Sequence, residues 1–176
     1  MDGKVDLPRI AEVIRVSGAQ VAVLQEVDRG MGRTQRRDLT AELAKALGWQ
    51  GVFDANLRTA DKGQYGNALL TSLPIKAWKN RVFPQTQPGE PRGLLRATLI
   101  WEGREVEVLT THLDATKDDA ERKHQVALVR EALLGLPAER PFILAGDFNA
   151  LPGSSTLQPL RERWTDAWPA LEQTEG

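Results

Sequence analysis

Cysteine is absent from this sequence, which excludes disulfide bonds, thiolate metal sites and cysteine nucleophiles together. Long apolar runs are also absent, since none approaches the ~20 residues that a membrane-spanning helix needs. The opening Met1-Asp2-Gly3-Lys4 lacks the apolar core of a signal peptide. We therefore expect a cytoplasmic protein, while a secreted, longer parent chain stays compatible with these residues.

An excess of positive charge is missing too, because 23 basic residues meet 24 acidic ones and the formal net charge is −1. Proteins that bind nucleic acid without sequence preference usually carry a clear basic excess, so the composition argues against that function. One local exception is the segment 28–38, which holds Arg29, Arg33, Arg36 and Arg37. We interpret this segment as a solvated loop rather than as a nucleic-acid site.

Hydrophobic periodicity predicts helices and strands in a single domain, residues 1–176. The first predicted helix has Val13 on its apolar stripe, and the last has Leu134 facing inward and Arg122 facing outward. The predicted helices cover residues 7–17, 39–47 and 119–134, with a helical turn at 155–161. The predicted strands cover residues 21–24, 50–54, 65–71, 75–83, 94–101, 105–111 and 142–145.

The most informative stretch is the segment 142–150, where an apolar run ends at Gly146 and Asp147 and Asn149 follow. A short apolar run bounded by Pro141 and Gly146 is typical of a buried strand. If extended backbone persists past Gly146, the period of two places the carboxylate and the amide on one side of the strand's end. A turn in which Asp147 and Asn149 bond their own backbone explains the same residues equally well.

Two further predicted strands end in polar side chains of catalytic type, Glu26 and His112. Hard cations such as Mg²⁺ bind one or two carboxylates together with water and substrate oxygens, which suits Glu26. Asp147 is suited to orient or deprotonate a water molecule, while Asn149 and His112 are suited to hydrogen-bond a charged phosphoryl oxygen. Zinc is a poorer fit, because His112 and His124 are the only histidines.

Four short blocks of this sequence resemble a known family when they are taken together and in order. The chain from about Lys4 to Trp168 resembles the endonuclease/exonuclease/phosphatase superfamily, the DNase I-like metal-dependent phosphoester hydrolases. The resemblance implies an α+β fold, a four-layer α/β/β/α sandwich. It also implies hydrolysis of a phosphoester with Mg²⁺, Mn²⁺ or Ca²⁺. The blocks are Val23-Leu24-Gln25-Glu26-Val27-Asp28, Tyr65-Gly66-Asn67-Ala68-Leu69-Leu70-Thr71, Thr110-Thr111-His112-Leu113 and Gly146-Asp147-Phe148-Asn149.

The resemblance also implies roles for single residues. Glu26 is similar to the family's metal ligand, and Asp147 to the residue that aligns the attacking water. Asn149 is expected beside Asp147, at the phosphate or the metal, so that Asp147 and Asn149 join both the catalytic and the metal-binding set. His112 resembles an active-site histidine of the DNase-like and lipid phosphatase-like branches. Asn67 is similar to a residue that contacts the substrate phosphate. Arg92, Arg96 and Tyr65 are further candidates for substrate contacts, and ordinary loop or strand roles explain these three residues at least as well.

The sequence departs from the family pattern at both ends. Family members usually begin with a strand that carries a metal-binding Asn, and they usually end with an Asp-bearing strand and a Ser-Asp-His segment. Neither feature occurs here, so we expect a family member that lacks the usual first strand and C-terminal strands. Sheet edges left uncovered in this way should pair with a second copy and give a homodimer.

Three readings of the function stay open at this point. The first is a nuclease- or phosphatase-like metal-dependent hydrolase, weakened by the missing ends, that acts on a nucleic acid, a lipid headgroup or a small phosphate ester. The second is a catalytically inactive binding or scaffold domain that retains the fold. The third is an unrelated α/β protein in which the acidic residues only form turns.

Overall fold

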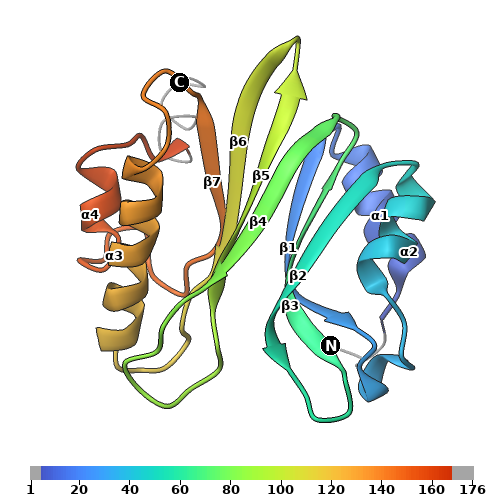
Figure 1. Cartoon of the computed structure of the whole chain (residues 1–176), viewed down its shortest axis with the longest axis horizontal. Helices are drawn as coiled ribbons and strands as arrows, with labels where there is room; N and C mark the ends of the chain where they lie inside the picture. The colour runs from blue at the N-terminus through green and yellow to red at the C-terminus, as the bar shows by residue number, and fades with distance from the viewer. Residues whose placement is uncertain (1–4, 168–176) are drawn as a thin grey trace.

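Two β-sheets pack face to face, and each carries two helices on its outer side, which makes four layers (Figure 1). The computed structural model describes residues 5–167. The strand order is β1-β3-β2 in sheet A and β4-β5-β6-β7 in sheet B. Neighbouring strands are antiparallel except for β6 and β7, which run parallel. The α+β four-layer sandwich predicted from the sequence is thereby confirmed.

The elements lie close to their predicted positions. The helices are α1 (Leu7–Val16), α2 (Leu39–Leu47), α3 (Ala120–Leu134) and α4 (Gln158–Arg161), with a 3₁₀ turn η1 (Gly32–Thr34). The strands are β1 (Val21–Arg29), β2 (Gln50–Arg58), β3 (Gln64–Thr71), β4 (Ile75–Val82), β5 (Gly93–Trp101), β6 (Arg104–His112) and β7 (Phe142–Asp147). Within residues 5–167, no helix is long and apolar enough to cross a membrane.

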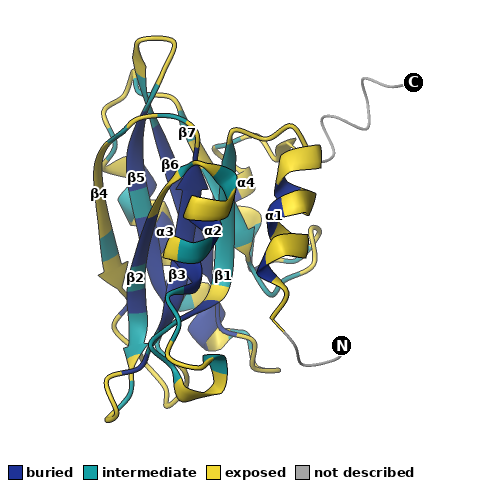
Figure 2. Cartoon of the chain, turned by 90° about the vertical axis from the view of Figure 1, so that its right-hand side faces the viewer, coloured by how far each residue is buried: buried dark blue, intermediate teal, exposed yellow. Residues whose placement is uncertain are grey.

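Three apolar clusters join the four layers. The middle layers meet through the inward faces of both sheets, and each sheet has a second cluster beneath its helices (Figure 2). β3 and β5 are buried along most of their length, whereas β4 is largely exposed at the edge of sheet B. The cluster between the sheets consists of Val52, Leu69, Leu95, Ala97, Leu99 and Val108.

The helix faces differ from the prediction in three side chains. On α1 the buried residues are spaced four and then three apart, and this stripe leaves Val13 on the solvent side. On α3 Leu134 is exposed at the last turn. Arg122 is buried, because its guanidinium donates to the backbone carbonyl oxygens of Asp114 and Thr116 in the preceding loop. These backbone acceptors were not visible in the sequence pattern.

A bulge in β1 determines where Glu26 lies. Leu24 pairs with Ala68 and Val27 pairs with Gly66, so two residues of β1 oppose one residue of β3. Glu26 takes a left-handed backbone angle, φ 59°. A bulge bends the strand and redirects a side chain, so β1 continues past the predicted end at residue 24 and turns Glu26 outward.

The parallel pairing of β6 and β7 aligns two other predicted site residues. His112 is in register with Asp147 at the ends of their strands. Gly146 is required just before this point, because a Cβ there would lie 2.0 Å from the carbonyl oxygen of Thr111. The extended backbone does not persist to Asn149, whose φ is 46°. Strand geometry therefore places Asp147, and a turn places Asn149.

Candidate active site

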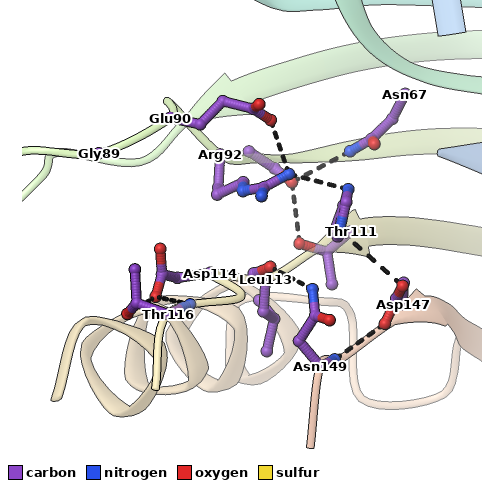
Figure 3. A network of polar contacts seen from close by, with 12 residues as sticks. Asn67, Gly89, Glu90, Arg92, Thr111, Leu113, Asp114, Thr116, Asp147 and Asn149 are labelled. Atoms are coloured by element: carbon purple, nitrogen blue, oxygen red, sulfur yellow. Dashed lines mark hydrogen bonds and ion pairs between the residues drawn. The ribbon is translucent and has the colours of Figure 1, made fainter. Parts of the chain in front are cut away.

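Asp147 and Asn149 lie together at one end of sheet B (Figure 3), and His112 lies beside Asp147. The alternation of β6 and β7 directs both His112 and Asp147 toward the space between the sheets. The Nε2 atom of His112 is 3.8 Å from Oδ2 of Asp147. His112 is buried, whereas the Asp147 side chain is 54% exposed. The pair therefore joins a buried imidazole to a carboxylate that water can reach.

The two oxygens of Asp147 have different surroundings. Oδ1 accepts the backbone N–H of Asn149 at 2.9 Å, which closes an Asx turn. The side-chain amide of Asn149 donates to the carbonyl oxygen of Leu113, also at 2.9 Å. These bonds fix the Asp147 carboxylate against β6. Its Oδ2 then faces His112 and solvent.

Glu26 approaches the same site from sheet A. Burial, the carboxylates of Glu90 and Glu26, and a hydrogen bond to Glu26 raise the pKa of Tyr65. The Tyr65 hydroxyl therefore stays protonated beside the Glu26 carboxylate. Glu26 also acts electrostatically on His112, as Asp147 does. Glu26, His112 and Asp147 are thus close enough to interact through their charges. Glu26 is linked to sheet B by charge rather than by direct bonds.

Arg92 reaches the site from the loop before β5. One of its terminal nitrogens lies 2.8 Å from Nδ1 of His112 and 2.8 Å from a carboxylate oxygen of Glu90. Burial and the positive charge of Arg92 lower the pKa of His112, and the carboxylates of Asp147, Glu26 and Glu90 offset part of this effect. His112 is accordingly neutral near pH 7.

Two of the expected substrate-binding residues have structural partners instead. Asn67 is buried, and its amide donates to the carbonyl oxygen of Gly93 at 3.3 Å, which ties sheet A to sheet B. Arg96 bonds to Glu107 on the other face of sheet B. Neither residue is joined to His112 or Asp147 by a direct contact. Their assignment to the substrate stays a prediction.

The arginines of segment 28–38 are matched by partners. Arg33 makes two hydrogen bonds to the buried Asp28, at 2.7 and 2.8 Å, and stacks over the Tyr65 ring. Arg36 pairs with Asp61 and Arg37 with Glu42. Arg29 bonds to Gln64 and lies over the ring of Phe53.

Comparison with known proteins identifies the family. The model of the Endonuclease/Exonuclease/phosphatase family matches residues 4–174, nearly the whole chain. The chain belongs to this family.

Two individual proteins are similar to this chain over most of its length. The uncharacterized protein YbhP of Escherichia coli K12 is 29% identical over 155 residues, which cover 81% of this chain and 58% of YbhP. An endonuclease/exonuclease/phosphatase from Beutenbergia cavernae is 26% identical with a TM-score of 0.66, over 89% of this chain and 46% of that one. The chain thus spans about half the length of these relatives.

Two more distant structures share the fold. D. rerio TDP2, solved in complex with a single-strand DNA product, has a TM-score of 0.73 at 20% identity, over 98% of this chain and 67% of that one. The mannosyl-6-phosphatase Bt3783 of Bacteroides thetaiotaomicron has a TM-score of 0.70 at 18% identity, over 89% and 61%. Both likenesses concern the architecture alone.

The resemblance to this family implies a divalent cation, and the donor set at the site limits which kind fits. Within residues 5–167, no cluster of three or more His, Asp and Glu side chains can hold an ion by itself. The candidate ligands are the exposed carboxylate of Glu26 and the oxygens of Asp147 and Asn149. Such a sparse oxygen set fits a cation that keeps much of its water and shares its coordination with the substrate, as Mg²⁺ does. It does not fit caged zinc.

Two contributors to the site were given no role in the sequence analysis. Glu90 lies in a proline-rich loop and becomes relevant only because Arg92 folds back onto β6. Gln25 donates to the hydroxyl of Thr110 at 2.9 Å and so links the bulge of β1 to β6. The predicted strands 94–101 and 105–111, which pair as β5 and β6, offered one clue. Their register, with Leu94 opposite Thr111, places Arg92 beside the end of β6.

Proposed function

We propose that this chain carries the catalytic site of a divalent-metal-dependent phosphoester hydrolase. The observation that carries the proposal is the convergence of an exposed Asp147 and a buried His112 at one end of sheet B, with Glu26 presented by a bulge of sheet A. Family membership supports the same reaction class. Among proteins of this fold, one is solved with a single-strand DNA product and another is a mannosyl-6-phosphatase.

The proposed chemistry divides the work between three side chains. Asp147 has one oxygen fixed by the Asn149 N–H and one directed to solvent, so it can accept a proton from water and align that water. His112, neutral and buried beside it, hydrogen-bonds a phosphoryl oxygen. Glu26, with Asp147 and Asn149, would hold the cation. A bound divalent ion supplies charge neutralisation at the phosphoryl oxygens.

For the substrate, we favour a compact phosphoester over a long nucleic acid. The net charge of −1 and the pairing of Arg33, Arg36 and Arg37 with acidic partners leave this region without a basic track for a backbone. A short nucleic-acid end, a lipid headgroup and a small phosphate ester all fit this description. A cytoplasmic location stays a prediction from the N-terminal sequence.

The test is hydrolysis of bis(p-nitrophenyl) phosphate and p-nitrophenyl phosphate with Mg²⁺, with Mn²⁺ and in EDTA. Glu26→Ala is compared with Glu12→Ala, since Glu12 is an exposed carboxylate on α1. We expect hydrolysis that needs the metal, is lost in Glu26→Ala and survives in Glu12→Ala. Hydrolysis that persists in EDTA would contradict metal dependence. A wild-type chain inactive on both esters with both metals would favour the inactive binding domain.

We also propose that the edge of β7 mediates a homodimer. The outer edge strand β4 carries Lys76, Lys79 and Arg81, which discourage pairing. β7 has no lysine, arginine or proline between Phe142 and Asp147, and its Ile143 is 56% exposed. β7 also borders a groove of about 680 Å³ lined by apolar side chains of β7, α4 and the segment 148–164.

A second copy suits this edge because an antiparallel pairing of β7 with its own copy is closed by a two-fold axis and leaves this edge of sheet B covered. Light scattering at micromolar concentration tests the proposal with Ile143→Lys, matched by Val82→Lys on the already protected strand β4. We expect Ile143→Lys alone to shift the mass from dimer to monomer. A monomeric wild type would refute the homodimer.

A further inference from the structure

Arg92 is a buried arginine that points into the site rather than to solvent. It is 7% exposed, and its terminal nitrogen is 2.8 Å from Nδ1 of His112. Arginine rarely lies inside a protein unless its charge is paired. Here the paired carboxylate is Glu90, two residues earlier, and the second partner is a neutral ring. The contact with His112 is therefore the part of this arrangement that needs an explanation.

The chemistry of the two groups determines where the histidine proton lies. A guanidinium has only donors, so Nδ1 of His112 must accept this hydrogen bond. A neutral imidazole carries one N–H, which is then on Nε2. Nε2 is the nitrogen that faces Asp147, at 3.8 Å from Oδ2. This distance is too long for a direct hydrogen bond and leaves the N–H available to a further acceptor.

The backbone around Arg92 is held at several points. The Arg92 carbonyl accepts the N–H of Phe83 at 2.8 Å. The next carbonyl, of Gly93, accepts the amide of Asn67 and the hydroxyl of Thr111. Together these bonds fix the exit of the loop against both sheets. The guanidinium is thus presented to His112 by a rigid base.

One polar atom of Arg92 is left without a partner. Its Nε atom is buried and has no hydrogen-bond partner among residues 5–167, as is also true of the structural Arg122. A buried donor without a partner costs roughly 1–3 kcal/mol and is rare in folded proteins. The contact with His112, rather than the unpaired Nε, therefore distinguishes Arg92.

We propose that Arg92 is a positioning residue that fixes His112 as the Nε2–H tautomer, so that the ring donates to a phosphoryl oxygen between His112 and Asp147. This inference rests on the proposed hydrolase function and extends it. Without the donor from Arg92, Nδ1 is free to carry the proton. Nε2 then becomes an acceptor that repels an anionic phosphoryl oxygen. Asn67 affects Arg92 only indirectly, because its amide bonds to the carbonyl oxygen of the next residue, Gly93.

The tautomer can be read directly from ¹⁵N-histidine NMR spectra at one fixed pH, in EDTA and without substrate. The chain has two histidines, so His124→Gln assigns both signals. We expect His112 to show the Nε2–H pattern in wild type and in Arg92→Lys, which keeps a donor. In Arg92→Met, which keeps the aliphatic stem, the pattern should change to a mixture or to Nδ1–H. A wild-type Nδ1–H pattern, or an unchanged pattern in folded Arg92→Met, would overturn the proposal.

Kinetics provide the second readout. With a phosphoester that the wild type hydrolyses, we expect Arg92→Met to lower kcat by up to about 10²-fold, the effect of losing one preorganised donor. KM should change little, and Arg92→Lys should recover part of the loss. Equal kcat in Arg92→Met and wild type would overturn the positioning role while leaving the hydrolase function intact. The NMR result decides the tautomer even if no ester is hydrolysed, so the two failures are distinguishable.

Discussion

Glu107 and His112 lie on the same strand, β6, and each receives a guanidinium from the neighbouring strand or loop, yet the two sites are built differently. Glu107 is fully buried and accepts hydrogen bonds from Arg96, Arg140 and Thr98 at 2.8–3.1 Å. At His112 the arginine meets a neutral ring. The first cluster joins opposite charges around one buried carboxylate. In the second, an arginine whose charge is paired with Glu90 also donates to a neutral imidazole.

The two clusters also differ in how far their polar groups are satisfied. At Glu107 a single carboxylate is shared by two guanidinium groups and a hydroxyl. At the candidate active site the Nε of Arg92 lacks a partner within residues 5–167, Glu26 has strained backbone, and Asp147 keeps one oxygen toward solvent. A satisfied cluster stabilises the fold, while an unsatisfied one leaves bonding capacity for a substrate. The comparison predicts that mutations in the two clusters affect different measurements.

Asp147→Asn should give the largest effect. It should lower the activity and leave the stability of the fold unchanged. The substitution keeps the acceptor oxygen for the Asn149 N–H but removes the charge that acts on water. General acid–base terms are worth about 10²–10⁴-fold, so kcat should fall by that factor with little change in KM. Steady-state kinetics on the better of the two chromogenic esters is the measurement, with Asp118→Asn as the exposed control. Unchanged turnover would remove Asp147 from the mechanism.

Glu107→Ala should affect stability and spare the site. It leaves the guanidinium groups of Arg96 and Arg140 without the carboxylate that they share. Breaking a buried pair in this way costs about 3–5 kcal/mol. Urea denaturation should show this loss, while kcat per folded molecule stays at the wild-type value. A loss of turnover in the folded fraction would mean that the two ends of β6 are coupled, contrary to the comparison.

Glu26→Gly tests the strain at the bulge, with opposite signs for stability and function. A non-glycine residue in the left-handed region costs about 1–2 kcal/mol, and glycine loses about 0.5–1 kcal/mol in chain entropy on folding. The free energy of unfolding should therefore rise by about 0.5–1 kcal/mol. Divalent-metal binding, measured by calorimetry, should be lost together with the carboxylate. Lower stability in Glu26→Gly would show that the Tyr65 hydrogen bond outweighs the strain.

The sequence predicted the ends of β6 and β7 to within two residues, because apolar runs bounded by glycine and proline are local signals. Asp147 and His112 follow from them once β6 and β7 pair in parallel. Glu26 is different, since the bulge depends on how β1 pairs with β3, which no local pattern records. The role of Arg92 depends on a loop folding back across the end of β6. Long-range pairing and buried guanidinium contacts are therefore the part that sequence reasoning could not supply.

The smallest expected effect is a pH dependence that belongs to the satisfied cluster. Burial by itself raises the pKa of Glu107, but hydrogen bonds from Arg96 and Arg140 outweigh it and hold the pKa below its ordinary 4.5. The unfolded chain then binds a proton near pH 4.5 that the folded chain does not, so the free energy of unfolding rises with pH in that window. The stabilisation is complete above pH 4.5 and is lost as pH falls through the folded pKa. Urea midpoints of wild type and Glu107→Gln should therefore converge in acid, with Glu12→Gln as the exposed control. A gap between the midpoints that stays constant down to the acid transition would show that the Glu107 carboxylate gains nothing from its two arginines.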